Sequence, residues 1–362
     1  MARKKNPVST EEINSLLNQI ITSGSISIVN PVDCKTLSNH IELVTHKRLS
    51  DSTLKRLFGF HRAQFSPAYE TINILKEYIN KTIATQTDNT NTADLIIDFF
   101  NPMHFEKIDA ADVGFQASCR SIAVYLKKNP QLLEAVLEPI ARSEQGRRFY
   151  YDLFPDYDLL TTIQYKGYQH FLIHEETYEG KMFANCLLFL KCFFENDLSG
   201  IQLYLNNISA LFESGKYLHP FVLGRYYQTQ LIGNSFFSPN NIDKIVQEVF
   251  EIEKSQPRDG KKLFLEFPGF HYFACDGLWH VDAFEALQKL SKIALTEFEQ
   301  FEEFKWKGFY DHLLIYYGLA LVKLKKHADA KKVFSQINTE NFYFPTKNYF
   351  LNLYQHFSTL VD

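Results

Sequence analysis

Two groups of side chains have the residue types and spacing to support metal or covalent chemistry. His170 and His174 are four residues apart, which would place both imidazoles on one helix face, where they could hold a metal ion. The glutamate of an HExxH motif is absent between them, and the sequence shows no third ligand. We therefore interpret both histidines as polar surface residues of an aromatic-rich helix.

The second group lies in an aromatic-rich stretch from 268 to 282. Cys275, Asp276, His280 and Asp282 could supply a nucleophile, a base and metal ligands. Sequence spacing alone does not establish their geometry. We predict instead a loop between helices that is packed by Phe and Tyr side chains.

The sequence contains no motif that commits the chain to an enzymatic reaction. The phosphate-binding patterns GxxxxGK[ST] and GxGxxG, the nucleophile motif GxSxG and a kinase-like set are all absent. Asp152, Asp156 and Asp158 surround Pro155, where aspartate is favoured as a turn or cap residue. We predict no catalytic residue, no metal site and no cofactor, and keep chemistry at 275 to 282 as a third hypothesis.

A third set of side chains has the chemistry of nucleic-acid contact. Lysine and arginine can neutralise phosphates or donate to guanine O6 and N7, while serine and threonine can contact either backbone or bases. The predicted DNA-contacting residues are Ser52, Thr53, Lys55, Arg56, Lys47, Arg48 and Arg62. We expect the first four on one helix face and the last three near that helix's ends, as phosphate contacts.

The segment from Leu37 to Phe60 is predicted to position this set as a helix, a turn and a second helix. The first helix has an apolar face formed by Leu37, Ile41 and Val44, and residues 45 to 48 form the turn. In the second helix, Ser50 is the N-cap, Gly59 is the terminator, and the buried stripe consists of Leu54, Leu57 and Phe58.

Flanking segments are predicted to complete a small core. Thr10 caps a helix from Glu11 to Ile21 whose apolar positions are Ile13, Leu16, Leu17, Ile20 and Ile21. Gly24 ends this helix, and Ser25 to Val29 alternates weakly, as in a short strand. A further helix follows Pro67, with apolar positions Tyr69, Ile72, Leu75 (or Ile74), Tyr78 and Ile79.

Charge and composition divide the chain. Residues 1 to 82 carry 11 Lys and Arg against 7 Asp and Glu, a net +4, and the remainder carries 27 against 35, a net −8. A polar, low-complexity stretch separates these parts. We predict a helix-turn-helix-like domain at 1–82, a polar linker at 83–94 and a helical-repeat-like domain at 95–362. The positive first domain favours nucleic-acid contact.

The residues from Leu37 to Leu75 resemble the lambda-repressor-like helix-turn-helix family. The resemblance rests on Leu37-Ser38, the run from Leu49 to Leu57, Ser66-Pro67, Thr71-Ile72 and Leu75, within a span of 39 residues. The stretch between Ile41 and Leu49 is longer than the family's by about two residues, and His46 or Lys47 stands where the family has a turn glycine. The resemblance implies a helical domain that binds DNA. The alternative is a helical cap whose basic residues form only a solvated face.

The larger part of the chain is predicted to be all-α. Hydrophobic residues make up 45% of the sequence, and 12 Pro and 15 Gly are few for 362 residues, which favours long helices over turn-dense strands. Helices are expected at approximately 114–128, 130–142, 181–195, 198–213, 240–254, 281–300 and 308–324.

One helix pair near the C-terminus resembles a tetratricopeptide repeat. The resemblance rests on Leu314, Tyr317-Gly318, Leu321, Ala330, Phe334 and Ile337. It places Gly318 and Ala330 where two helices approach closely. One such repeat cannot bury its apolar face alone, so we expect neighbouring pairs to stack on it, although no second copy of comparable quality is found.

A helix-turn-helix joined to such an array is similar in architecture to the bacterial peptide-sensing transcriptional regulators. The resemblance implies three partners: duplex DNA, an effector peptide or protein held by the array, and a second copy of the chain in a homodimer. The alternative is a protein-interaction scaffold of helical repeats with a cap that does not bind DNA.

We expect the protein to act in the cytoplasm. The longest apolar run, Leu313 to Val322, is shorter than the roughly 18 residues of a membrane span. No apolar segment follows the basic N-terminus, as a secretion signal would require. The five scattered cysteines include no CxxC pair, so buried reduced thiols are expected.

Overall fold

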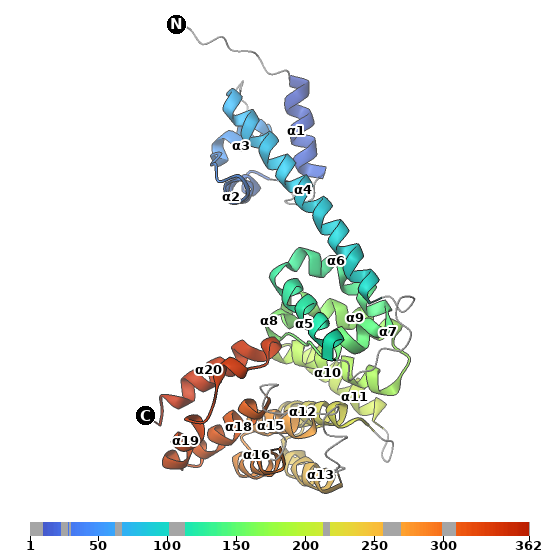
Figure 1. The fold of residues 1–362 in the computed structure, drawn as a ribbon, viewed down its shortest axis with the longest axis vertical. Helices are drawn as coiled ribbons and strands as arrows, with labels where there is room; N and C mark the ends of the chain where they lie inside the picture. The colour runs from blue at the N-terminus through green and yellow to red at the C-terminus, as the bar shows by residue number, and fades with distance from the viewer. Residues whose placement is uncertain are drawn as a thin grey trace. The chain divides into compact units, whose positions relative to one another are not determined.

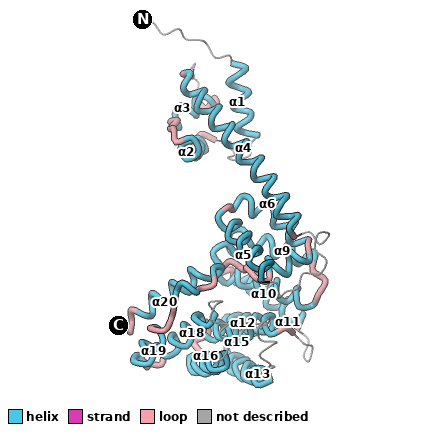
Figure 2. Tube along the Cα trace, in the orientation of Figure 1, coloured by secondary structure: helices cyan, strands magenta, loops and turns pink. Residues whose placement is uncertain are grey.

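The fold is helical throughout the part of the chain that the structure describes. The structure is a computed structural model, and it describes residues 10–22, 28, 30–61, 67–100, 113–212, 218–255, 269–298 and 309–361. Within these ranges the regular elements are helices joined by loops, and there is no strand (Figure 2). The predicted all-α class is therefore confirmed. None of the described helices is both long and apolar enough to cross a membrane.

The chain divides into two compact units, Met1–Leu95 and Ile96–Asp362. The polar stretch from 83 to 94, predicted as a linker, has helical backbone and belongs to helix α4 (Tyr69–Phe99). Polar composition indicated that this stretch has little to bury, but it does not prevent the backbone from forming helical hydrogen bonds. The division between the units falls inside α4, next to the end of that stretch.

The first unit packs α1 (Thr10–Thr22), α2 (Asp33–Thr45), α3 (Asp51–Leu57) and the start of α4 around one apolar core (Figure 1). The buried members of this core are Leu16, Ile20, Cys34, Leu37, Ile41, Leu49, Leu54, Ile72, Ile74, Leu75, Tyr78 and Ile79. The apolar stripes of all four helices are thus largely as predicted. Two assignments were wrong, because Ile21 is 50% exposed and Tyr69 is 70% exposed.

Helix α2 starts earlier than the first apolar residue of its stripe. Its first residue is Asp33, and the backbone N–H of Asn30 donates to the Asp33 carboxylate at 2.8 Å. The Asn30 side chain in turn accepts a hydrogen bond from the backbone N–H of Val32 at 2.9 Å. The predicted strand from Ser25 to Val29 and the predicted stop at Gly24 lie outside the described residues, apart from Ile28.

The described part of the second unit consists of successive helices. Their bounds are α5 Val113–Lys128, α6 Pro130–Arg142, α7 Glu144–Gly146, α8 Tyr157–Leu159, α9 Tyr165–His174, α10 Tyr178–Phe194, α11 Leu198–Leu211, α12 Pro220–Phe237, α13 Ile242–Ser255, α15 Gly269–His280, α16 Phe284–Phe298, α18 Phe309–Lys323, α19 His327–Phe334 and α20 Lys347–Ser358. Two π-helical turns, Arg147–Tyr151 and Leu160–Gln164, adjoin α7 and α8. The seven predicted helical segments match α5, α6, α10, α11, α13, α16 and α18 within a few residues.

Helices of the second unit associate in consecutive pairs. The pairs α10–α11, α12–α13, α15–α16 and α18–α19 each pack together, and the first members α10, α12, α15 and α18 also contact one another in that order (Figure 1). Helix α20 packs against α18 and α19. The first helix of each pair is therefore covered on several sides, which requires it to be apolar around most of its surface.

The α18–α19 pair has the close approach predicted for Gly318. A Cβ atom on Gly318 would lie 2.7 Å from the ring of Phe334, closer than non-bonded carbon atoms approach. Ala330 and Phe334 are both buried in the contact. Gly318 thus allows the aromatic ring of α19 to rest on the backbone of α18.

Candidate nucleic-acid interface

Helix α3 has the caps that the sequence predicted. The Ser50 side chain accepts a hydrogen bond from the backbone N–H of Thr53 at 3.2 Å, which satisfies one of the free donors at the helix start. Gly59, just beyond the helix end, has φ +75°, a left-handed conformation that favours glycine. Leu54 lies between the caps and is fully buried in the core of the first unit. The two caps and the burial of Leu54 fix which face of α3 points outward.

The turn before α3 begins at His46, which has φ 57°. The left-handed conformation costs a residue with a Cβ atom about 1 kcal/mol, which is why glycine is common just after a helix end. The His46 N–H donates to the carbonyl of Glu42 at 2.9 Å and closes the last turn of α2. Of His46 and Lys47, the two residues predicted at the turn position, His46 is the one with the left-handed conformation.

Side-chain hydrogen bonds hold the rest of the turn. The Thr45 hydroxyl donates to the carbonyl of Ile41 at 2.7 Å and accepts from the backbone N–H of Lys47 at 3.2 Å. Across the turn, the Ser38 hydroxyl donates to the carbonyl of Leu49. Both hydroxyl residues are buried, so the turn is anchored to the core although its outer residues are exposed.

The outward face of α3 presents hydroxyl and cationic groups. Ser52 and Arg56 are exposed, while Thr53 and Lys55 are partly buried. The Ser52 and Thr53 hydroxyls each lie 2.9 Å from the Ser50 hydroxyl. The structure therefore brings together the four predicted residues of this face in one surface patch at the start and middle of the helix.

Lys55 is paired within its own helix. Its ammonium group lies 3.0 Å from the Asp51 carboxylate, one helical turn earlier, and its side chain is 26% exposed. The hydrogen bond and the charge of Lys55 together lower the pKa of Asp51. An exposed pair of this kind contributes little to stability, so a phosphate can replace Asp51 as the partner of Lys55.

Lys47 is paired with a residue of α4. Its ammonium group lies 2.8 Å from the Glu77 carboxylate, which also accepts from Lys81 at 2.9 Å. Hydrogen bonds from these two lysines lower the pKa of Glu77 to about 2. Two lysines thus share the Glu77 carboxylate at this corner of the unit.

The remaining predicted phosphate contacts are Arg48 and Arg62. The Arg48 side chain is 75% exposed, and its nearest acidic group is the Glu42 carboxylate at 3.7 Å. Arg62 lies outside the described residues. The structure thus places Arg48 beside Lys47 in the turn that leads into α3.

Glu77, Lys81 and Lys35 belong to the electrostatics of this surface but were not predicted. Glu77 and Lys81 are four residues apart on α4, a spacing that favours an ion pair on one helix face, and this signal was available in the sequence. Lys35 on α2 contributes to the lowered pKa of Asp51 through its charge. Its nearness to α3 depends on tertiary packing and has no sequence signal.

The lowered pKa of Glu77 predicts a pH-dependent stability of the first unit. Its folded pKa, about 2, is below its ordinary value of 4.5, so its ionised form stabilises the fold above pH 4.5, and the effect is lost as pH falls toward 2. We expect wild type to show slower hydrogen exchange than Glu77→Gln in α2 and α4 at pH 6, and this difference to vanish near pH 2. A difference in hydrogen exchange that stays constant from pH 6 to pH 2 would contradict the lowered pKa of Glu77.

Among the described residues, the histidine and aspartate side chains that could have bound a metal ion make structural contacts instead. His174 Nε2 lies 3.2 Å from the Glu138 carboxylate, in a partly exposed pair. Asp156 caps α8 by accepting from the backbone N–H of Asp158 at 3.0 Å, as expected for a turn residue, and Lys127 pairs with both carboxylates.

The stretch around Cys275 is a helix, and the predicted loop was wrong. Residues 269 to 280 form α15, which is buried around most of its surface. Burial raises the pKa of the Cys275 thiol well above its ordinary value, which opposes formation of the nucleophilic thiolate. The Asp276 carboxylate is used by buried hydrogen bonds, and Asp282, at φ 56°, belongs to the turn that follows. All five cysteines are buried free thiols.

Comparison of the chain with protein-family models, with curated proteins and with solved structures finds no match. The side chains and their geometry are therefore the basis on which a function is proposed.

Proposed function

We propose that this protein is a DNA-binding transcriptional regulator of the cytoplasm. In this proposal α3 enters the major groove of duplex DNA, with Ser52, Thr53, Lys55 and Arg56 facing the bases and backbone. Lys47 and Arg48, together with Arg62, hold phosphates. The observation that carries the proposal is the exposed hydroxyl and cationic face of α3, fixed by its caps and by the buried Leu54.

The dimensions of this element suit the groove. An α-helix with its side chains is about 10 to 12 Å across, close to the roughly 12 Å width of the major groove of B-DNA. The turn before α3 places Lys47 and Arg48 beside the helix start, where phosphates flank the groove. The short ion pairs of Lys47 and Lys55 lie at the surface, so exchanging them for phosphate contacts costs little.

The second unit supports the sensing part of the proposal. Among the described residues, four helix pairs whose first helices contact one another in chain order fit the arrangement expected for a helical-repeat array. Such arrays present extended grooves that bind peptides or proteins, and their outer helices can join two copies. A homodimer would give two copies of α3, which fits a palindromic target.

Replacing Lys55 and Arg56 tests this proposal. We expect Lys55→Ala together with Arg56→Ala to weaken binding to duplex DNA by at least about tenfold at low salt. The slope of log affinity against log salt should fall by about 0.9 for each of the two cations that contacts a phosphate, and by about 1.8 at most. The measurement is fluorescence anisotropy with a duplex enriched by unbiased selection, over a series of salt concentrations.

Two further variants control this experiment. Lys331→Ala with Lys332→Ala removes the same number of cations from the exposed face of α19 and should leave affinity unchanged. Glu77→Gln removes the acidic partner of Lys47 and Lys81 and should raise affinity at low salt. If the Lys55 and Arg56 variant bound duplex DNA with the affinity of wild type, α3 would not be part of the DNA interface.

The alternative function is a protein-interaction scaffold in which the first unit is a cap. The paired helices of the second unit favour this function as much as a sensor, because repeat grooves bind partners in both cases. Selection with the purified protein separates the two functions. Enrichment of a discrete, palindromic sequence supports the regulator, whereas nonspecific binding that is lost at moderate salt supports the scaffold.

A further inference from the structure

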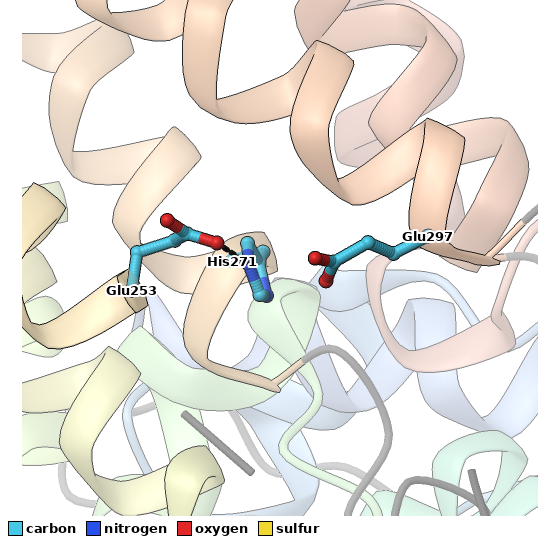
Figure 3. Close-up of side chains that lie close together, drawn as sticks. All are labelled: Glu253, His271 and Glu297. Atoms are coloured by element: carbon cyan, nitrogen blue, oxygen red, sulfur yellow. Dashed lines mark ion pairs between the residues drawn. The ribbon is translucent and has the colours of Figure 1, made fainter. Parts of the chain in front are cut away.

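Three potential metal ligands from three helices of the second unit converge in its interior (Figure 3). Glu253 is in the last turn of α13, His271 is in the first turn of α15, and Glu297 is near the end of α16. Glu253 is 3% exposed and His271 is 5% exposed, while Glu297 is partly buried. The carboxylates lie on opposite sides of the imidazole ring in Figure 3.

Both glutamates occupy positions that continue an apolar helix face. Glu253 follows Ile245 and Val249 at intervals of four residues, and these three are the buried residues of α13. Glu297 follows the buried Ala294 by three residues, which places it near the inward side of α16. Carboxylates are rarely buried in such positions unless a cation, a hydrogen bond or a metal ion compensates their charge.

The distances are close to those of a metal site. His271 Nε2 lies 3.8 Å from Glu253 Oε1, and one ligand atom from each of the three residues lies within 4.8 Å of the other two. Ligand atoms about 2.1 Å from a tetrahedral metal ion are about 3.4 Å apart. Rotation of the two flexible glutamate side chains, which moves their carboxylate oxygens by about an ångström, would therefore bring the three ligand atoms to the spacing of a metal site. The helices would not have to move.

We propose that Glu253, His271 and Glu297 bind one divalent transition-metal ion, with Zn²⁺ as the best-matched ion. One imidazole nitrogen and two carboxylate oxygens form a ligand set that Zn²⁺ accepts, and three protein ligands leave a fourth position for water or another group. Ca²⁺ and Mg²⁺ prefer oxygen ligands throughout, and Cu⁺ prefers sulfur.

Bound metal would join the ends of α13, α15 and α16. These helices belong to two consecutive pairs of the array, so the ion would cross-link one pair to the next. Because binding is possible only when the three ends are together, the metal should stabilise the folded second unit. This inference does not depend on DNA binding, since the three ligands and the surface of α3 lie in different units.

The test uses the untagged full-length chain, stripped with a chelator and kept reduced. We expect Zn²⁺ to bind at about one ion per chain in a calorimetric titration, and to raise the unfolding temperature with increasing concentration. Co²⁺, which replaces Zn²⁺ in such sites, should give a visible absorption band. His271→Gln and Glu297→Gln should each weaken Zn²⁺ binding by at least about tenfold.

A matched control is His174→Gln, which removes a histidine from the surface pair with Glu138 and should leave Zn²⁺ binding unchanged. Glu297→Gln, at a partly buried position, serves if His271→Gln does not fold. Absence of stoichiometric binding, or equal affinity in wild type and Glu297→Gln, would overturn the proposal. The cluster would then be a set of side chains that only stabilises the fold. Loss of DNA binding with retained Zn²⁺ binding would refute only the proposed function.

Discussion

Gly224→Val is expected to lower the free energy of unfolding of the second unit by more than about 3 kcal/mol. Gly224 lies on α12 where that helix crosses α15. A Cβ atom there would lie 2.4 Å from the carbonyl oxygen of Gly269 and 2.7 Å from the Cα atom of Phe270. Both are backbone atoms, so the clash can be relieved only by moving a helix.

Two other glycines show that the α12–α15 crossing depends on close backbone approach. A Cβ atom on Gly269 would lie 2.7 Å from the Cα atom of Phe221, and one on Gly277 would lie 2.9 Å from the Cα atom of Gln228. Helix propensity acts in the opposite direction, since alanine is favoured over glycine by about 1 kcal/mol. At Gly224 the backbone clash should outweigh this gain even for alanine.

Urea unfolding followed by tryptophan fluorescence measures this effect, because both tryptophans, Trp279 and Trp306, belong to the second unit. Gly233→Ala is a matched control in the same helix. Its new Cβ atom would meet the side chain of Leu205, which can rotate away, so its effect should be smaller. Equal midpoints for Gly224→Val and wild type would show that α12 and α15 do not pack this closely.

Asp276→Ala is expected to destabilise the second unit by about 3 to 5 kcal/mol. The Asp276 side chain is 4% exposed and accepts hydrogen bonds from Gln228 and Tyr316, and from Tyr349 at 3.1 Å. Alanine would leave three donors without their acceptor, two of them on the buried residues Gln228 and Tyr316 and one on the partly buried Tyr349. Each unsatisfied donor costs about 1 to 3 kcal/mol, less whatever an entering water recovers.

The same network extends to a buried cation. Gln228 accepts a hydrogen bond at 3.0 Å from Arg225, whose guanidinium group lies 3.7 Å from the centre of the Phe273 ring and donates to Tyr157 at 2.7 Å. Gln228 thus connects Arg225 to Asp276 without direct contact between the two charges. Loss of Asp276 should therefore also loosen Arg225, which is 1% exposed.

The control for this prediction is Asp329→Ala. Asp329 is a 64% exposed residue of α19 that lies 3.8 Å from Lys332, and its replacement should change stability by less than about 0.5 kcal/mol. Asp276→Asn should be intermediate, because the remaining carbonyl oxygen still accepts from the tyrosines. A midpoint for Asp276→Ala within error of wild type would mean that the network does not form in solution.

The first unit could be predicted well from the sequence because its helices are amphipathic. The stripes through Leu37, Leu54 and Ile72 are buried as expected, and Ser50 and Gly59 cap α3. These features depend on residues within one or two helical turns of each other. The candidate DNA-contacting side chains were found in the same way, because a residue opposite a buried stripe must face outward.

The ion pairs between charged residues were harder to predict from the sequence than the helices of the first unit. Lys47 and Glu77 are 30 residues apart, and their contact requires the turn before α3 to pack against α4. The cluster of Glu253, His271 and Glu297 has the same character, since each residue alone is an ordinary helix residue. Such contacts between distant segments are set by helix packing.

The sequence by itself determined the helical class, the core of the first unit and the polar face of α3, because local periodicity and capping encode them. Tertiary structure alone decided the character of α15, which sequence analysis took for a loop. A helix covered on nearly all sides has no polar face and therefore no helical periodicity to detect. Tertiary structure also decided which carboxylates lie beside His271, because three separate helices must meet before those charges become neighbours.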